Sequence, residues 1–124
     1  MGKPGYTGIR RIIRAARFSL QGLAYAWREE AAFRQEVLLA VVLIPSAFWL
    51  GRNPTEIAFL IGSCLLVLVI ELVNSAIEAV VDRFGEDQHV LAGAAKDLAS
   101  AAVMISLIFL GVVWVAVIYE RIYT

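Results

Sequence analysis

The sequence is poor in the residues that build disulfides, metal sites and turns. Among its 124 residues it has one cysteine, one histidine and three prolines. A single cysteine excludes an internal disulfide and gives no metal-binding spacing, so we expect Cys64 to be a packing residue. The net charge is zero, and no overall basic field therefore favours nucleic acid as a partner.

The glycine-rich phosphate-binding loops of soluble nucleotide enzymes are absent too. The chain contains no G-x-x-x-x-G-K-[ST], no G-x-G-x-x-G and no H-R-D sequence. If ATP binds, its phosphates must be held by Mg²⁺ on carboxylates, by Lys96 and by arginines. The first 26 residues also lack the apolar core of a signal peptide, because arginines interleave with apolar residues there.

Apolar sequence is what the chain has in excess. Hydrophobic residues make up 60% of it and the mean hydropathy is +0.76, far above an ordinary soluble domain of this size. We therefore predict an all-α membrane protein with a single membrane domain over residues 1–124. The expected elements are an amphipathic interfacial helix over about 6–28 and transmembrane helices over about 31–50, 57–83 and 94–120.

The distribution of cations predicts the orientation of these spans. Seven lysines and arginines precede Val37 and two lie between Asp82 and Asp97, against one in the turn 51–56 and one after Tyr119. Because cationic loops stay on the cytoplasmic side, we expect a cytoplasmic N-terminus and a cytoplasmic second loop. That orientation brings the polar end of the second span, the acidic segment around Glu30 and the Lys96 region to one membrane surface.

A polar stripe runs along the second half of the second span. Glu71, Asn74, Ser75, Glu78 and Asp82 fall within about 100° of arc, and the other faces are apolar. Glu71 and Glu78 are about 10 Å apart along the axis, too far to ligate one metal ion, so we expect different roles for them. Glu78 lies near the headgroups, where Mg²⁺ and a nucleotide can reach it.

Glu71 lies deeper, where an apolar surround suits a carboxylate to general-base work on a substrate held in the lipid phase. The structural alternative is a hydrogen bond between Glu71 and Asn74 that holds helices together.

Three segments resemble the bacterial diacylglycerol kinase family of small three-span membrane kinases. They are Glu30-Ala-Ala-Phe-Arg-Gln-Glu36, the run E-L-V-N-S-A-I-E-A-V-V-D-R from Glu71 to Arg83, and His89 followed by Gly93-Ala-Ala-Lys-Asp97 and Ser100. The resemblance covers nearly the whole chain. It implies a homotrimeric bundle in the bacterial inner membrane, with active sites shared between subunits at the cytoplasmic surface. The implied reaction is Mg²⁺- and ATP-dependent phosphorylation of diacylglycerol to phosphatidic acid, in phospholipid recycling.

The resemblance also implies roles for individual residues. Glu71 would be the catalytic base with Asn74 in support, and Glu30 and Glu78 would bind Mg²⁺. The residues implied at the nucleotide are Arg11, Phe18, Glu30, Glu78, Asp87, Gln88, His89, Lys96 and Asp97. Those implied at the lipid are Arg34, Gln35, Glu36, Trp49, Glu71, Ser100 and Trp114. The sequence departs from the family pattern at four positions, with Phe18 and Gln88 in place of tyrosines and Ala24 and Ala94 in place of basic residues.

Other functions fit parts of the same pattern. Undecaprenol kinase shares the family pattern and differs in the lipid accepted. A small proton-coupled transporter could use Glu71 as its proton carrier, and a purely structural assembly factor is the remaining alternative. Three spans and a polar loop resembling an ATP site favour the kinase.

Overall fold

The computed structural model describes residues 7–84 and 89–124, and every regular element in this part of the chain is an α-helix. Their order is α1 (Ile9–Glu29), α2 (Ala31–Leu50), α3 (Pro54–Arg83) and α4 (Val90–Tyr123). The last three are long and apolar enough to cross a membrane. The predictions of an all-α chain and of three candidate spans are therefore confirmed.

Helices α3 and α4 begin earlier than their apolar runs suggest, because side chains cap them. The Asn53 side chain accepts a hydrogen bond of 2.9 Å from the backbone N–H of Glu56, and Pro54 occupies the first helical turn. His89 Nδ1 accepts a 3.0 Å hydrogen bond from the N–H of Leu91. These polar residues extend each helix outward from its apolar part.

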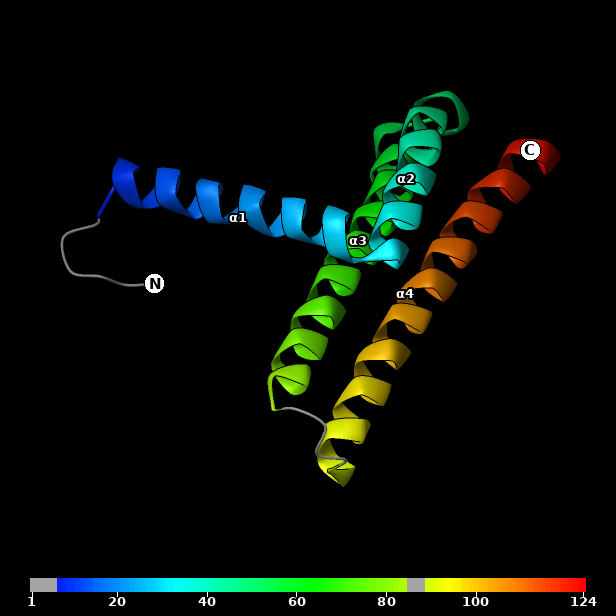
Figure 1. The fold of residues 1–124 in the computed structure, drawn as a ribbon. Helices are drawn as coiled ribbons and strands as arrows, with labels where there is room; N and C mark the ends of the chain where they lie inside the picture. Colours follow the sequence, from blue (N-terminus) through cyan, green and yellow to red (C-terminus); the bar gives the residue numbers. More distant parts are fainter. Residues whose placement is uncertain (1–6, 85–88) are drawn as a thin grey trace.

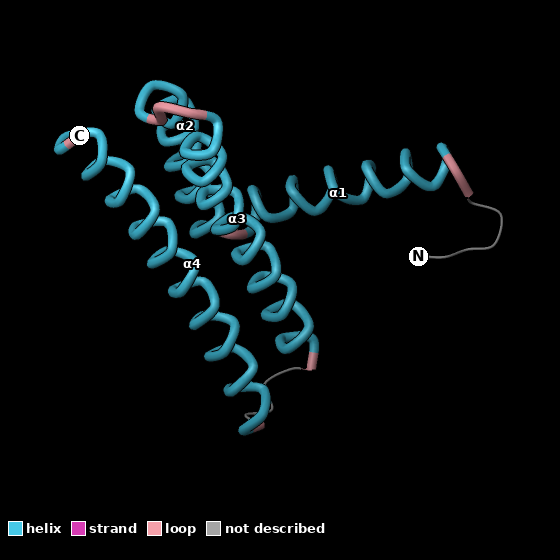
Figure 2. Tube along the Cα trace, turned by 180° about the vertical axis from the view of Figure 1, so that it is seen from behind, coloured by secondary structure: helices cyan, strands magenta, loops and turns pink. Residues whose placement is uncertain are grey.

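The three long helices form a bundle, and α1 projects sideways from it (Figures 1 and 2). The α2–α3 turn and the C-terminus lie at one end of the bundle, and the last turn of α3 and the first turn of α4 lie at the other (Figure 1). Helix α1 meets α2 part-way along α3. The last turns of α3 and the first turns of α4 therefore continue beyond the level of α1.

A sharp corner joins α1 to α2. Glu30 alone leaves the helical conformation, with φ −120° and ψ 105°. Phe33 is buried beside it, with 4% of its surface exposed. Arg34 Nη1 donates hydrogen bonds to the carbonyls of Trp27, at 2.7 Å, and Arg28, at 3.1 Å. These are carbonyls at the C-terminus of α1, which lack helical donors, so Arg34 stabilises the corner.

The apolar core lies toward the end of the bundle that holds the α2–α3 turn. Its buried members come from all three long helices and are Ala40, Ala47, Leu50, Leu60, Cys64, Trp114 and Val117. Cys64 is 2% exposed, which confirms its expected packing role. Trp114 Nε1 donates a 3.3 Å hydrogen bond to the carbonyl of Leu60 and so ties α4 to α3.

An arginine-centred cluster closes the same end. Arg52 Nη2 lies 2.7 Å from Glu120 Oε2 and 3.5 Å from Glu56 Oε2, and Arg52 Nη1 donates to Thr124 Oγ1 at 2.9 Å. The α2–α3 turn is thereby joined to the end of α4. The buried apolar cluster of the three long helices lies toward this end, and the polar stripe of α3 runs away from it.

Candidate active site at the corner of α1 and α2

Four glutamates gather where the corner meets α3. The carboxylate of Glu30 lies within electrostatic range of Glu78 and Glu71. Glu36, on the second turn of α2, interacts with Glu71. This arrangement follows from the antiparallel packing of α2 against α3, which sets the first turns of α2 beside the second half of α3. Segments more than thirty residues apart in sequence thus contribute to one cluster.

The cluster has a strong local negative charge. Burial, followed by the charges of Glu78, Glu71 and Glu29, raises the pKa of Glu30 above its ordinary value. Within residues 7–84 and 89–124, no lysine or arginine forms an ion pair with Glu30, Glu36, Glu71 or Glu78. A cation bound from solution would relieve the repulsion.

Magnesium fits this donor set. It is usually held by one or two protein carboxylates, with water and substrate phosphates completing its shell. Glu30 and Glu78 offer two carboxylates that interact with each other across the corner. No three His, Cys, Asp or Glu side chains converge on one point in the described part of the chain. The arrangement therefore suits an ion that arrives with a nucleotide better than a permanent structural ion.

Glu71 is the most enclosed acid of the cluster. Only 4% of its surface is exposed, and Ser75, one turn along the same face of α3, is 6% exposed. Asn74 faces the other way along the stripe, and its Nδ2 donates a 3.4 Å hydrogen bond to Glu78 Oε1. Asn74 therefore contacts Glu78. The hydrogen bond between Asn74 and Glu71, which is the structural alternative to a catalytic role, is not among those formed in the described residues.

Two polar atoms next to Glu71 are buried and unpaired within the described residues. They are Glu36 Oε2 on α2 and Ser75 Oγ on α3. Such atoms are rare in native proteins because each loses its bond to water without gaining another. They mark a position where a polar group of a substrate could bind. The sequence pattern places Ser75 in the polar stripe but assigns it no role; its position four residues after Glu71 is the signal that could have indicated one.

A cation and further polar groups lie beyond the cluster, on the last turns of α3 and the first turns of α4. Lys96 Nζ lies 2.7 Å from Asp82 Oδ1 and is within electrostatic range of Glu78. His89 caps α4, and Asp97 is exposed one residue after Lys96. Ser100 is exposed on the next turn. Asp87 and Gln88 lie outside the described residues.

Other predicted nucleotide residues lie far from the cluster of their own chain. Arg11 and Phe18 are exposed on the projecting part of α1 (Figure 1). At the helical rise they are about 28 Å and about 18 Å from Glu30 along the axis. Phe18 packs under the Arg14 guanidinium, 5.5 Å from the ring centroid. A single chain does not bring these side chains to Glu78.

The predicted lipid residues divide into two groups. Gln35 is exposed and Glu36 is partly buried beside the cluster, whereas the guanidinium of Arg34 is engaged at the corner. Trp49 and Trp114 lie toward the opposite end of the bundle. Trp49 is exposed, with the Arg121 guanidinium over its ring. Trp114 is buried in the core, where it donates to the carbonyl of Leu60, a residue about 16 Å from Glu71 along the axis of α3.

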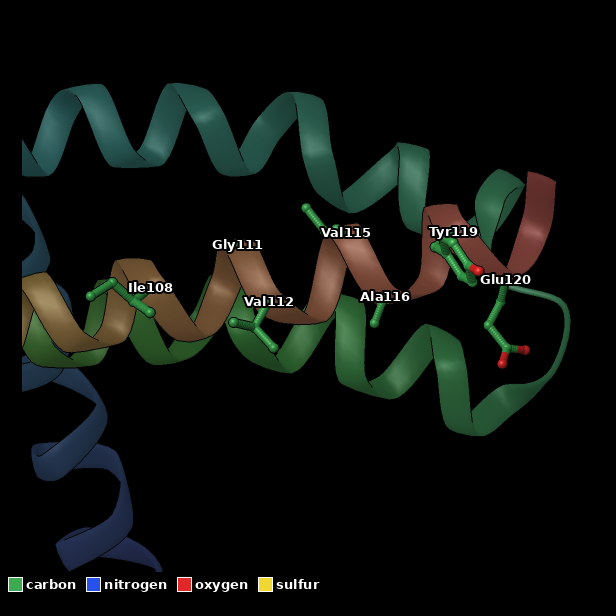
Figure 3. A pocket seen from close by; sticks show the side chains of 7 residues that line it. All are labelled: Ile108, Gly111, Val112, Val115, Ala116, Tyr119 and Glu120. Carbon is green, nitrogen blue, oxygen red and sulfur yellow. The ribbon is translucent and has the colours of Figure 1, made fainter. Parts of the chain in front are cut away.

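A shallow groove runs along the outer surface of α4. Its lining residues are Ile108, Gly111, Val112, Val115, Ala116, Tyr119 and Glu120 (Figure 3). All seven belong to the second half of that one helix, and six of them are apolar or aromatic. The groove is therefore separate from the glutamate cluster, which lies beside the other half of the bundle.

Comparison with known proteins relates the sequence to one family. The sequence profile described as prokaryotic diacylglycerol kinase matches residues 17–118. The chain is 48% identical to the protein named diacylglycerol kinase of Haemophilus influenzae, over 91% of this chain and 96% of the relative. It is 50% identical to the proteins of that name from Pseudomonas aeruginosa, over 92% and 93%, and Escherichia coli K12, over 93% and 94%.

The match includes α2 and α3 entirely and most of α1 and α4, so it contains the corner and all four glutamates of the cluster. The chain belongs to the prokaryotic diacylglycerol kinase family.

Proposed function

We propose that this protein is a diacylglycerol kinase that transfers the γ-phosphoryl group of ATP to diacylglycerol, giving phosphatidic acid and ADP. The observation that carries the proposal is the division of the glutamate cluster into two parts. Glu30 lies at the corner between α1 and α2, and Glu78 lies nearer than Glu71 to the C-terminal end of α3. Glu71 is buried, with 4% of its surface exposed. A water-soluble nucleotide and a membrane lipid require access from these two directions.

In the reaction, Glu71 accepts the proton of the lipid hydroxyl. The hydroxyl oxygen forms a bond to the γ-phosphorus as the bond between that phosphorus and the β,γ-bridging oxygen breaks, and the electron pair leaves with ADP. Glu30 and Glu78 would hold Mg²⁺, which when bound neutralises phosphate charge. Asn74 would keep Glu78 in position through its hydrogen bond. Lys96, which pairs with Asp82 and is within electrostatic range of Glu78, would add positive charge for the phosphates.

The proposed location is the inner membrane of a bacterium, with the N-terminus and the site on the cytoplasmic side. The excess of lysine and arginine before Val37 supports that orientation. Helix α1 would lie in the interface, since it runs across the direction of the three spans (Figure 1). Its exposed side chains include both Ile12 and Arg17, as an interfacial helix requires.

The proposed assembly is a homotrimer with active sites shared between subunits. Its support is the distance of Arg11 and Phe18 from the glutamates of their own chain, because a neighbouring chain is what could bring α1 to a nucleotide site. Exposed apolar side chains along α4, such as Ile105 and Val112, supply surface for helix packing between subunits or for lipid. In this arrangement residues 1–124 act as one membrane domain.

The test is a phosphorylation assay on folded protein in mixed micelles with Mg²⁺ and labelled ATP. Diacylglycerol, undecaprenol and no lipid are offered in parallel. We expect phosphatidic acid to form, with far less product from undecaprenol. If undecaprenol is phosphorylated preferentially, then undecaprenol and not diacylglycerol is the substrate. If neither lipid is phosphorylated, the proposal that the protein is a lipid kinase is refuted.

A further inference from the structure

Asp82 is the one acid of the α3 stripe that the proposed reaction leaves without a role. Its Oδ1 lies 2.7 Å from Nζ of Lys96. Asp82 belongs to the last turn of α3 and Lys96 to the second turn of α4. The ion pair therefore joins these two helices at the end of the bundle opposite the Arg52 cluster (Figure 1).

Stability explains little of this ion pair. The carbonyls at the C-terminus of a helix carry partial negative charge, so an aspartate in the last turn of α3 is unfavourable for the helix. The side chains are partly exposed, 44% for Lys96 and 64% for Asp82, and ion pairs in such positions contribute little to the free energy of folding. What the pair does fix is the position of the ammonium group, since a free lysine side chain has many rotamers.

Glu78 is the other acid on α3 that attracts this ammonium group. It lies one turn before Asp82 on the same stripe, about 6 Å away along the axis, and is within electrostatic range of Lys96. The lysine side chain is long and flexible enough to cover that distance. An ammonium group on Glu78 would occupy a carboxylate that the proposed reaction needs for Mg²⁺. Asp82 and Glu78 thus compete for one cation, and in the structure Asp82 holds it.

We propose that Asp82 is a positioning residue that keeps the ammonium group of Lys96 away from Glu78. Glu78 then remains free to bind Mg²⁺, and the ammonium group lies about one helical turn beyond it, where it can contact the phosphates that arrive with the metal. Asp82 itself contacts neither the metal nor the nucleotide. The inference rests on the proposed function, because it assumes that Glu78 and Lys96 bind Mg²⁺·ATP.

The test compares two ion pairs of equal length at opposite ends of the bundle. Asp82→Asn removes the carboxylate beside Lys96, and the control Glu120→Gln removes the carboxylate 2.7 Å from Arg52. We expect Asp82→Asn to raise KM for Mg²⁺·ATP about fivefold to tenfold, while kcat changes by less than about twofold. The free Mg²⁺ concentration needed for half-maximal rate should rise as well. Glu120→Gln should change neither quantity, and Asp82→Glu, which keeps the carboxylate, should restore most of the affinity.

A double substitution shows whether Asp82 acts through Lys96. The readout is the Kd of a non-hydrolysable ATP analogue with Mg²⁺, which does not depend on turnover. Asp82→Asn should weaken binding in the wild-type background and have no further effect in Lys96→Met. An equal effect in both backgrounds would overturn the proposal.

Two other results would also contradict it. Unchanged binding in Asp82→Asn would show that the ion pair has no role at the nucleotide. Tighter binding in that variant would show that Asp82 withholds Lys96 from the phosphates. A wild-type protein that binds no Mg²⁺·ATP and phosphorylates no lipid would instead refute the proposed kinase function, which is a distinguishable result.

Discussion

At the scale of single residues, the raised pKa of Glu30 predicts how metal binding depends on pH. Only the ionised carboxylate binds Mg²⁺, and burial together with Glu78, Glu71 and Glu29 favours the protonated form. As pH falls, Glu30 therefore becomes protonated at a higher pH than an ordinary glutamate. We expect the apparent affinity for Mg²⁺·ATP to decrease over that range, measured as KM for Mg²⁺·ATP at several pH values.

The matched variant for this prediction is Glu30→Gln, which cannot ionise. It should bind Mg²⁺·ATP more weakly than the wild type at neutral pH, and its KM should vary less as the pH is lowered. A wild-type KM for Mg²⁺·ATP that stays constant until the ordinary glutamate range of about pH 4.3 would contradict the prediction.

At the scale of the helices, Arg34 controls the corner that presents Glu30. Its hydrogen bonds to the carbonyls of Trp27 and Arg28 end α1 immediately before Glu30. In Arg34→Met, which keeps the apolar part of the side chain, we expect a loss of about 1 kcal/mol in the free energy of unfolding. We also expect KM for Mg²⁺·ATP to rise severalfold, because Glu30 is less well placed. Thermal unfolding in detergent and Mg²⁺·ATP titration measure the two effects.

Arg28→Met is the control, since it removes a neighbouring exposed arginine and leaves the corner hydrogen bonds in place. The opposite pattern for Arg34→Met, with KM raised for diacylglycerol and unchanged for Mg²⁺·ATP, would favour the direct lipid contact that the resemblance implies.

The helices themselves could be largely predicted from the sequence, because the apolar runs and the turn at 51–56 are local signals. The earlier starts of α3 and α4 could not be read from hydropathy, since they depend on Asn53 and His89 as capping residues. The stripe on α3 predicted that Glu71 and Glu78 differ in depth, which the burial of Glu71 supports. Whether Glu36 comes within electrostatic range of Glu71 depends on how α2 packs against α3, and helical periodicity within one element contains no information on that register.

At the scale of the whole molecule, the shared site can be tested by mixing subunits. Arg11 and Phe18 lie far from the glutamates of their chain, whereas Glu30 and Glu71 lie together within it. Co-assembled chains carrying Arg11→Ala with Phe18→Ala and chains carrying Glu71→Gln should regain activity, since some sites then receive an intact α1 and an intact Glu71. Diacylglycerol kinase activity of the mixture is measured against each variant alone.

Chains of Glu30→Gln mixed with chains of Glu71→Gln provide the contrast. Both side chains belong to one chain's cluster, so no mixed site is complete and activity should not return. Recovery in this second mixture, with none in the first, would show that the division of the site between subunits is the reverse of the one proposed.

The most direct measurement is the turnover of Glu71→Gln with diacylglycerol at saturating Mg²⁺·ATP, on protein whose assembly and nucleotide binding are checked in parallel. Amide replaces carboxylate at nearly the same volume, so the packing of α3 against α2 is preserved while the base is lost. We predict that kcat falls by a factor of about 10² to 10⁴ and that Mg²⁺·ATP still binds. A kcat close to that of the wild type would contradict the assignment of Glu71 as the base that activates the lipid hydroxyl.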